Sequence, residues 1–457
     1  MMGEPPIDVR NEPARGWQLR PAMKYASYGV VRTIPPSETI RRVTPLLERI
    51  GVTRVADVTG LDRAGIPNFT TVRPRERGEG LSYYNGKGVT RTAAHAGALM
   101  EAVERYTAEL CDFPIHCCTF EEIQQHGPAI DPDSLIAPRA MKYQRDLALE
   151  WIEGFDFVSE QGIYLPLNAV LYPYFPSEGR RVLYDAGTNG LASGNTLEEA
   201  LCHALCEVIE RDAMAVSDAW IDLAPSVARV LQNLGITVPA SNLSNDERFP
   251  LIDLETLPPR ALMLVRKLQR AGILVYLRDI TSTARIATLD CTIVERQLDG
   301  RCLAHGGTGS HPDARVAATR ALTEASQSRV GHIQGGREDL DRIVGGQGRF
   351  DPDEVYGRRT VRPFSAVASF EHSSIDEDIR FLLERLKEDG FKHVIAVDLT
   401  RLEVGIPVVR VVIPGTEAWS VYVNHGRRGQ FGSRIAAILH DGIARGASVA
   451  KSTAAGT

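Results

Sequence analysis

Long apolar runs and an excess of basic residues are both missing from this chain of 457 residues. Without about 20 consecutive apolar residues, no segment is expected to cross a bilayer. The 52 lysines and arginines stand against 58 aspartates and glutamates, so general binding to nucleic acid is not expected. The polar start, from Met1 to Pro13, lacks the apolar core of a secretory signal. We therefore expect a cytoplasmic protein with no membrane or nucleic acid as its partner.

Cysteine is also scarce, and paired metal-binding cysteines are absent. The seven cysteines contain no C-x-x-C pair, which leaves little support for a structural zinc site. Cys202 and Cys206 lie four residues apart in a helical pattern, where small buried thiols are expected. The sequence also has no G-x-x-x-x-G-K-[ST] loop, no G-x-S-x-G elbow and no H-E-x-x-H helix. The chain therefore lacks the common signatures of P-loop, serine-hydrolase and zinc-protease sites.

Helical and strand-like segments alternate without a strict βαβ order, which predicts an α+β fold with mixed β-sheets. The longest helices, the second of them capped by Thr196, are predicted at 92–110, 196–217 and 312–331. A hairpin is predicted from two β-rich runs at 154–158 and 163–171. The remaining predictions are an exposed loop at 336–363, helices at 375–389 and 432–445, and strands at 393–398 and 406–413.

No shift in composition marks a linker between independent domains. We expect a flexible N-terminal segment at 1–23, one large intergrown catalytic domain at 24–446, and a disordered tail at 447–457. Long carboxylate-bearing helices around a nucleotide site would form the centre of that domain.

One helical motif appears three times along the chain. The first two copies read Ala-Leu-x-Glu-x-x-Glu-Arg, at 98–105 and 204–211. A degenerate third copy at 321–329 keeps Ala-Leu-x-Glu and has a glutamine where the second glutamate would be. Glycine-rich stretches at 86–88, and at 187–190 with 193–195, precede the first two copies and are predicted as loops.

The spacing of the motif brings its carboxylates together. Residues three apart share a helix face, so Glu101 lies beside Glu104 and Glu207 beside Glu210. At about 100° per residue, Glu199 falls on the same side of its helix as the second pair. Two such helices in contact would need arginine, protonation or a divalent metal, because like charges 4 Å apart repel by roughly 1–4 kcal/mol. Oxygen ligands select Mg²⁺ or Ca²⁺, and Mg²⁺ usually adds substrate phosphates, which indicates a nucleoside triphosphate site. A solvated helix face with intrahelical ion pairs is the alternative.

The ordered motifs resemble those of the YcaO family. The first signature is Gly86-Lys87-Gly88 with the first glutamate pair, the second is 189–194 with the second pair, and the third is 309–312 with 324–329. The resemblance runs from about residue 24 to about residue 420 and implies ATP and Mg²⁺ as cofactors. It implies metal ligation by Glu101, Glu104, Glu207 and Glu210. It implies nucleotide-site or supporting roles for Lys24, Lys87, Arg105, Glu199, Arg211, Gln327 and Arg329.

Two details of that resemblance stay open. Arg211 has a second interpretation, in which it only pairs with the carboxylates. Gly97 stands where the family often has a serine, which removes one hydroxyl contact from the first helix.

The resemblance also implies the reaction, which is the activation of a peptide backbone amide. Resonance makes the amide C–N bond partly double and its carbonyl a poor electrophile, so the carbonyl oxygen has to become a leaving group. Phosphorylation by ATP achieves this, and the attacking nucleophile then decides the product. An external sulfide gives a thioamide, whereas a Cys, Ser or Thr side chain of the substrate gives an azoline.

The C-terminal part favours thioamidation. It lacks the Pro-x-Pro-x-Pro tail that azoline-forming relatives commonly carry, and residues 405–417 are similar to YcaO proteins that work with a TfuA partner. We find no fused module for leader-peptide binding or sulfur delivery. The expected partners are therefore a precursor peptide or protein, a TfuA-like protein and a sulfur source, with a homodimer as a further option. An azoline-forming cyclodehydratase and a non-catalytic nucleotide-binding scaffold remain the alternatives.

Overall fold

Long helices packed on β-sheets organise the described part of the chain. The computed structural model describes residues 17–27, 30–74, 82–109, 113–135, 143–177, 182–183, 187–223, 227, 230–231, 233–234, 248–298, 300–336, 351–357, 359–418, 434–437 and 440. The α-helices are α1 (Pro36–Val43), α2 (Arg91–Thr107), α3 (Phe120–Ile123), α4 (Leu197–Asp218), α6 (Pro259–Arg270), α7 (Ala314–Gln334), α8 (Pro352–Tyr356) and α9 (Ile375–Glu388). None of the helices in these residues is long and apolar enough to cross a membrane.

The strands form separate sheets, mostly with antiparallel pairing. A hairpin pairs β1 (Tyr25–Ser27) with β2 (Val30–Arg32). The three-stranded sheet has the order β3 (Arg54–Asp57), β4 (Asn68–Val72), β5 (Tyr83–Lys87). The five-stranded sheet has the order β13 (Cys302–Ser310), β12 (Thr288–Arg296), β11 (Leu274–Asp279), β10 (Leu251–Asp253), β14 (Val361–Pro363). The six-stranded sheet has the order β6 (His116–Cys118), β7 (Leu149–Asp156), β15 (Ile395–Asp398), β16 (Val408–Val412), β9 (Leu191–Ser193), with β8 (Gln161–Pro166) also pairing with β7.

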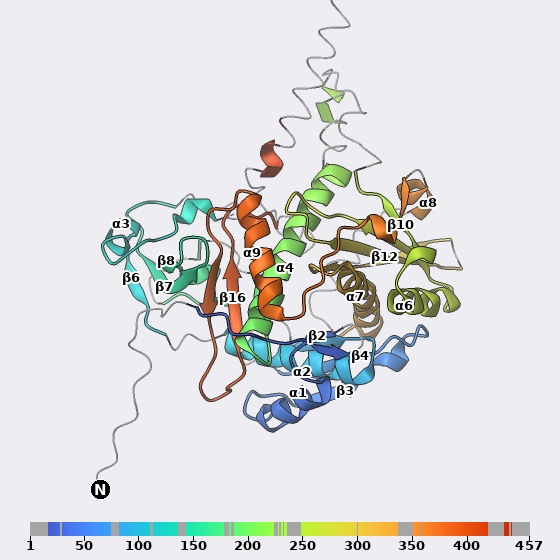
Figure 1. The fold of residues 1–457 in the computed structure, drawn as a ribbon, viewed down its shortest axis with the longest axis horizontal. Coiled ribbons are helices and arrows are strands. Elements are labelled where there is room, and N and C mark those ends of the chain that lie inside the picture. Colours follow the sequence, from blue (N-terminus) through green and yellow to red (C-terminus); the bar gives the residue numbers. More distant parts are fainter. Residues whose placement is uncertain are drawn as a thin grey trace, which may run out of the picture.

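Each long helix packs on the sheet whose strand it follows in sequence. α2 follows β5 and packs on β4 and β5, α4 follows β9 and packs on β9 and β16, and α7 follows β13 and packs on β12 and β13. Figure 1 shows these three units around a common centre, with α9 alongside α4. The α+β fold class that the sequence predicts is confirmed.

Apolar faces and side-chain caps explain why these segments form helices. Thr196 accepts a hydrogen bond from the Glu199 backbone N–H at 3.2 Å, so the predicted cap of α4 is confirmed. Leu201, Leu205 and Val208 of α4 are buried in a core shared with α9 and the six-stranded sheet. Comparable cores lie under α2 and under α7, so each carboxylate helix is held by its own apolar packing.

The predicted positions of the long helices and of the β7–β8 hairpin are confirmed to within a few residues. The predicted loop at 336–363 is wrong in its described part, because α8 and β14 lie there and β14 pairs with β10. Residues 434–437 are helical, but most of the predicted helix at 432–445 lies outside the described residues, as do the segments 1–16 and 447–457.

The glycine loop predicted at 86–88 is also wrong, because Gly86 and Lys87 belong to β5. A Cβ on Gly86 would lie 2.1 Å from the carbonyl oxygen of Ala94 in α2. Gly309 of β13 has the same relation to α7, since a Cβ there would lie 2.2 Å from the carbonyl oxygen of Ala317. These glycines therefore allow a helix to lie directly on a strand. They do not form a turn between elements.

That close approach predicts different effects for two glycines of β13. Gly309→Ala should lower the free energy of unfolding by about 3 kcal/mol, because the methyl group meets the α7 backbone and neither element can yield easily. The change is measured by urea unfolding followed by circular dichroism.

The matched control is Gly306→Ala, in the same strand, where an added Cβ would meet nothing within 4 Å. Its stability should stay within about 0.5 kcal/mol of the parent chain. Equal losses in the two variants would show that the packing of β13 on α7 is not the reason for the glycine.

Candidate functional site

Carboxylates from α2 and α4 each reach the strand of the next structural unit. Glu104 of α2 accepts a hydrogen bond at 3.1 Å from the backbone N–H of Ser193 in β9. Glu210 of α4 accepts one at 3.1 Å from the backbone N–H of Ser310 in β13. The charge of Glu207 also acts on Glu104, so the structure brings the two glutamate pairs near each other.

The third motif copy closes this arrangement into a ring. Gln327 of α7, the counterpart of Glu104 and Glu210, donates from Nε2 to the carbonyl oxygen of Asn85 in β5 at 2.6 Å. The polar side chain at the second motif position thus links α2 to β9, α4 to β13 and α7 to β5. A backbone N–H is a strong partner for a buried carboxylate. These hydrogen bonds therefore fix the position of each helix relative to the strand of a neighbouring unit.

Two glutamates at the first motif position both contact β5: Glu101 of the same unit and Glu324 of the α7 unit. Glu101 accepts a hydrogen bond at 3.0 Å from the backbone N–H of Asn85. Glu324 of α7 forms an ion pair with Lys87 of β5, with 2.5 Å between Oε2 and Nζ. Lys87 therefore joins the carboxylate site through Glu324, a residue that the sequence analysis placed in the third copy but did not select as a ligand.

Burial of like charges changes the protonation of this cluster. Burial raises the pKa of Glu104 to about 8, and the nearby carboxylates of Glu207 and Glu101 add to the rise. Burial is also the largest cause that raises the pKa of Glu207. At neutral pH the cluster therefore holds protons that a divalent cation would replace.

Glu210 and Glu324 titrate in opposite directions. Burial raises the pKa of Glu210, and the charge of Glu324 adds to it. Burial would also raise the pKa of Glu324, but Lys87 and Arg211 hold it well below its usual range. Glu324 is thus the member of this pair that stays ionised.

The arginines that follow each glutamate pair neutralise part of the charge. The Nη2 atom of Arg105 lies 3.3 Å from Glu101 and 3.8 Å from Glu104. The Nη2 atom of Arg211 lies 3.9 Å from Glu210. The Nη1 atom of Arg105 is buried and has no hydrogen-bond partner within the part of the chain that the structure describes. That donor is available to an anionic group.

Arg320 is a further cation that the sequence analysis missed. It lies one turn before Glu324 on α7, and its charge acts on Glu207 and Glu210. Its guanidinium forms no hydrogen bond or ion pair among the described residues. The signal in the sequence is the i, i+4 spacing to Glu324, which places the two side chains on one helix face.

Three residues selected from the sequence have other contacts. The Glu199 carboxylate accepts hydrogen bonds from the backbone N–H groups of Thr33 and Asn195. The ammonium of Lys24 lies 2.7 Å from Asp378. The hydrogen bonds of Glu199 and the ion pair of Lys24 therefore join residues outside the three motif copies.

Arg329, the third of them, belongs to a separate ion-pair network. Its guanidinium is buried between Asp62, at 3.2 Å, and Glu295, at 2.8 Å. The structure therefore brings Lys87, Arg105, Arg211 and Gln327 to the carboxylates, and gives Arg329 a partner elsewhere.

Hard oxygen ligands beside guanidinium N–H donors that lack partners among the described residues fit a magnesium-bound polyphosphate. The carboxylates of Glu101, Glu207 and Glu324 supply oxygens, and Arg105 and Arg320 supply donors that lack partners. The repulsion between the buried carboxylates gives a physical reason for a cation to bind at this place.

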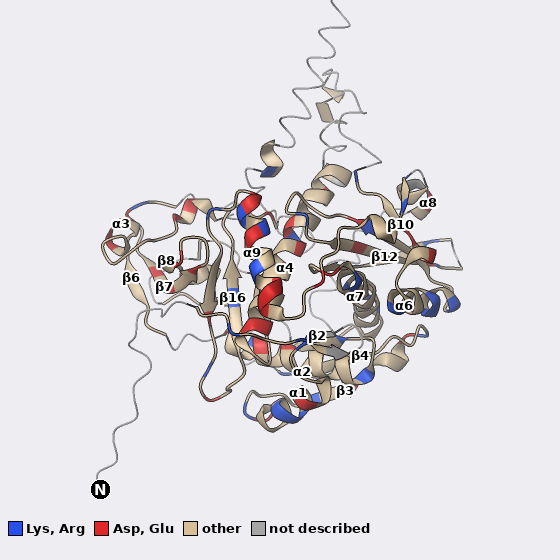
Figure 2. Ribbon diagram, in the orientation of Figure 1, with Lys and Arg blue, Asp and Glu red and all other residues tan. Residues whose placement is uncertain are grey.

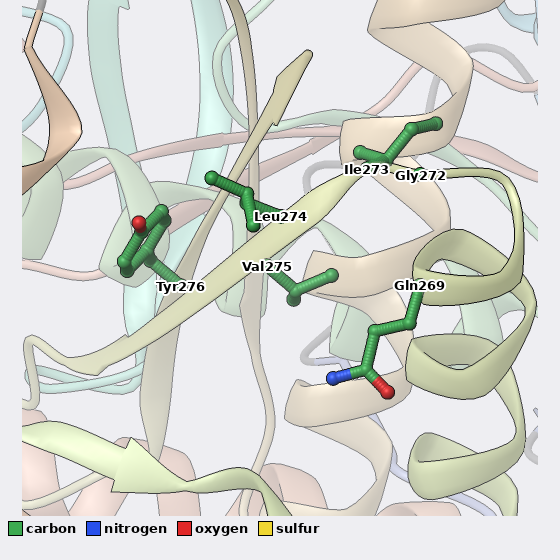
Figure 3. Close-up of a pocket in the computed structure, with 6 residues that line it drawn as sticks. All are labelled: Gln269, Gly272, Ile273, Leu274, Val275 and Tyr276. Carbon is green, nitrogen blue, oxygen red and sulfur yellow. The ribbon is translucent and has the colours of Figure 1, made fainter. Parts of the chain in front are cut away.

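An open groove elsewhere on the surface lacks this chemistry. Figure 3 shows its lining at the junction of α6 and β11, where it is formed by Gln269, Gly272, Ile273, Leu274, Val275 and Tyr276. No carboxylate and no cation line it, so it does not belong to the glutamate site.

Comparison with known proteins assigns the family. Residues 85–417 match the family described as YcaO cyclodehydratase, ATP- and Mg²⁺-binding. The chain therefore belongs to the YcaO family. An uncharacterized protein of Methanothermobacter thermautotrophicus is 36% identical, with 85% of this chain and 96% of the relative aligned. An uncharacterized protein in the tfuA 3′ region of Rhizobium leguminosarum bv. trifolii is 32% identical, over 86% of this chain and 91% of the relative.

The fold also matches a solved structure. YcaO from Methanopyrus kandleri, bound with AMPPCP and Mg²⁺, superimposes with a TM-score of 0.66 at 24% identity. The match covers 90% of this chain and 99% of that protein. It confirms a YcaO-like fold for this chain.

The buried carboxyl of Glu104 predicts a pH dependence of stability. Its pKa rises from 4.5 to about 8 in the folded chain, so the unfolded state loses the proton at lower pH. The stability of the metal-free chain should therefore fall as pH rises from about 4.5 to about 8. Glu104→Gln removes this titration. The free energy of unfolding of the variant, relative to that of the parent chain, should therefore increase across that interval.

Urea unfolding in EDTA at pH 5.5 and pH 8.5 measures the difference. The control is Glu384→Gln, which replaces an exposed carboxylate on α9 and should leave the pH profile unchanged. A Glu104→Gln curve parallel to that of the parent chain would contradict the protonated state assigned to Glu104.

Proposed function

We propose that this chain is an ATP- and Mg²⁺-dependent enzyme that phosphorylates the oxygen of a peptide backbone amide and so allows sulfide to replace it. The observation that carries the proposal is the ring of carboxylates from α2, α4 and α7 beside the unpartnered donors of Arg105 and Arg320. The family description and the ligands of the Methanopyrus kandleri structure support ATP and Mg²⁺ as cofactors.

The contacts suggest different duties for the ring carboxylates. Glu104 and Glu210 each commit an oxygen to a backbone N–H, so each has only its other oxygen for a metal. Glu207 and Glu324 lie beside them, with the oxygens of Glu324 shared between Lys87 and a long contact of 3.5 Å to the Thr308 N–H. We assign Glu101, Glu104, Glu207 and Glu210 to Mg²⁺ and add Glu324 to that set.

The cations of the site are assigned to the phosphates. Arg105, Arg211 and Lys87 would exchange part of their contact with the carboxylates for phosphate oxygens. Arg320 would bind phosphate oxygens with donors that have no partner among the described residues, while Gln327 keeps α7 on β5. Bound Mg²⁺ supplies charge neutralisation for the transferred phosphoryl group. We place Lys24 and Glu199 at the edge of the same site. Arg329 would support the position of α7 through its ion pairs with Asp62 and Glu295.

The chain's own cations would then stabilise the transfer of the phosphoryl group. Guanidinium and ammonium groups fixed around the phosphates stabilise the negative charge that develops in transfer. The phosphorylated amide oxygen leaves when a nucleophile adds to the carbonyl carbon and the C=S bond forms in place of C=O. The phosphate carries away the electron pair and the oxygen atom.

Sulfide as the nucleophile is the finer part of the proposal. It is supported by residues 405–417, which are similar to TfuA-associated YcaO proteins, and by the relative encoded beside tfuA. The partners would be a precursor peptide or protein, a TfuA-like protein and a sulfur source, in the cytoplasm, where free thiols stay reduced. The competing function is azoline formation, which the cyclodehydratase description of the family favours.

Loss of one ring carboxylate should remove nucleotide binding. Glu207→Gln should weaken the binding of Mg²⁺ with a non-hydrolysable ATP analogue by on the order of 100-fold, about 2.7 kcal/mol, because one anionic ligand is lost from a buried site. Isothermal titration calorimetry measures the affinity. Relief of carboxylate repulsion should leave the melting temperature of the variant equal to or above that of the parent chain.

The control for this experiment is Glu121→Gln, which removes an exposed carboxylate of α3. Its affinity should equal that of the parent chain. Parent-like affinity in Glu207→Gln would place the nucleotide elsewhere.

The mass of the product decides between the two reactions. Exchange of oxygen for sulfur adds about 16 Da to the peptide, whereas cyclodehydration removes about 18 Da. The chain is incubated with ATP, Mg²⁺, sulfide, the TfuA-like protein and the precursor peptide, and mass spectrometry reads the product. The expected gain should require sulfide, and a sulfide-independent loss of water would establish the azoline reaction instead.

A further inference from the structure

A second buried polar cluster lies where the N-terminal segment crosses α4 and α9. The backbone N–H of Arg20 donates to Glu198 of α4 at 3.0 Å, and that of Ala22 donates to Asp376 of α9 at 2.9 Å. Figure 2 shows acidic residues along α9, which packs against α4. The segment is thus fastened to the first turns of both helices.

Lys24 is the charged centre of that cluster. Its Nζ atom lies 2.7 Å from Asp378 Oδ2 and donates to the carbonyl oxygen of His372 at 2.8 Å. An ammonium has three N–H donors, so one donor remains after these two contacts. The long flexible side chain of Lys24 is therefore held in one place with a donor to spare.

Asp378 collects contacts from several elements. Its side chain is fully buried, and its Oδ1 atom lies 2.9 Å from His372 Nδ1. Its Oδ2 atom, which pairs with Lys24, also faces His311 Nε2 at 3.7 Å. One carboxylate thus connects the segment before β1, the junction of β13 with α7, and the start of α9.

His311 contributes a donor that has no partner. Its Nδ1 atom accepts a hydrogen bond from the backbone N–H of Asp313 at 2.9 Å, so the proton of the neutral ring is on Nε2. That Nε2 atom is buried and has no hydrogen-bond partner within the described ranges. An unpaired buried donor costs roughly 1–3 kcal/mol, so a bound acceptor would stabilise this place.

The same tautomer makes a metal site unsuitable here. Cys202, His311 and Asp378 offer ligand atoms within 4.8 Å of one another. A metal would need a lone pair on His311 Nε2, which carries the proton, and the ammonium of Lys24 already occupies the carboxylate. The group therefore suits an acceptor-bearing anion better than a cation.

Positive charges surround the imidazole of His311. Lys24, Arg320 and Arg32 act on His311, and their charges add to burial in lowering the pKa of the imidazole to about 3. His203 of α4 has Arg320, Arg32 and Lys87 around it and is also kept neutral. His311 directly follows Ser310, whose backbone N–H donates to Glu210, and its Nε2 atom lies 3.7 Å from Asp378. The Lys24–Asp378 pair therefore adjoins the glutamate site through His311.

We propose that Asp378 is a positioning residue that holds the Lys24 ammonium for an anionic group of the bound nucleotide. The inference rests on the proposed ATP site, because the anion it concerns is part of that ligand. Without Asp378, the flexible lysine would lose its anchor and would reach the ligand only at an entropic cost. Asp378 itself would not touch the nucleotide.

The test is a double-mutant cycle on the Michaelis constant for ATP, read in peptide-dependent ATP hydrolysis. Asp378→Asn should raise this constant about tenfold and leave kcat within about twofold, since it removes an anchor and no reacting group. Lys24→Ala should raise it by a similar factor. In the double variant the two effects should not multiply, because Asp378 acts through Lys24.

The matched control is Glu377→Ala, in the same first turn of α9. Glu377 is exposed and completes the capping box with Ser374, so its loss destabilises the helix without touching Lys24. The control substitution should lower the melting temperature and leave the Michaelis constant for ATP unchanged. If Asp378→Asn behaves like this control, or if its effect multiplies with that of Lys24→Ala, Asp378 has only a structural role.

Two further measurements separate failure of folding from failure of the inference. If Asp378→Asn does not fold, Asp378→Glu is tested instead. This variant keeps the charge but moves the carboxylate oxygens by one methylene, and it should still raise the Michaelis constant for ATP severalfold. A parent-like constant there would contradict the inference. The parent chain and Glu207→Gln are assayed in parallel. Absence of ATP hydrolysis in the parent chain would contradict the proposed function. Normal hydrolysis in the parent chain, with an unchanged Michaelis constant in the Asp378 variants, would contradict only this inference.

Discussion

Repulsion between buried carboxylates is the constraint on which this structure depends. Glu104, Glu207 and Glu210 come from α2 and α4 into one place where burial and mutual charge raise their pKa values. Like charges 4 Å apart repel by about 4 kcal/mol at an effective protein dielectric. Backbone N–H groups of β9 and β13 offset part of this repulsion, and the neighbouring arginines offset more. The repulsion that these groups do not offset favours binding of a cation. The same repulsion therefore destabilises the metal-free site and promotes binding of Mg²⁺.

The rest of the fold keeps the three helices close enough for this to happen. Two of the helices lie directly on a glycine-containing strand of their own sheet, as Gly86 under α2 and Gly309 under α7 show. Each helix also reaches the strand of the next unit, and Gln327 closes the set by bonding to Asn85. The neutral glutamine limits the charge of the third unit, while Lys87 and Glu324 pair across the same junction. Packing and electrostatics therefore depend on the same few contacts.

The periodic features of the sequence predicted much of this arrangement. Helix lengths, the Thr196 cap and the shared face of each glutamate pair follow from local spacing, and the structure confirms the helices. The Gly86 strand was misread as a loop, because a glycine that fits under a helix looks in sequence like one that forms a turn. Arg320 was missed because a lone arginine carries no motif, and the partners of Arg329, Asp62 and Glu295, lie far away in the chain. Long-range counter-ions are set by the tertiary fold and leave no local pattern.

The central claim is that the glutamate ring holds a metal-bound nucleotide, and anomalous diffraction tests it most directly. Crystals of the chain would be grown with Mn²⁺ and a non-hydrolysable ATP analogue, so that the anomalous signal locates the metal. The account predicts Mn²⁺ within about 2.2 Å of carboxylate oxygens of the assigned glutamates, with phosphate oxygens at Arg105 and Arg320. The assigned glutamates are Glu101, Glu104, Glu207, Glu210 and Glu324. A metal bound elsewhere, with the ring carboxylates still paired to Arg105 and Lys87, would contradict it.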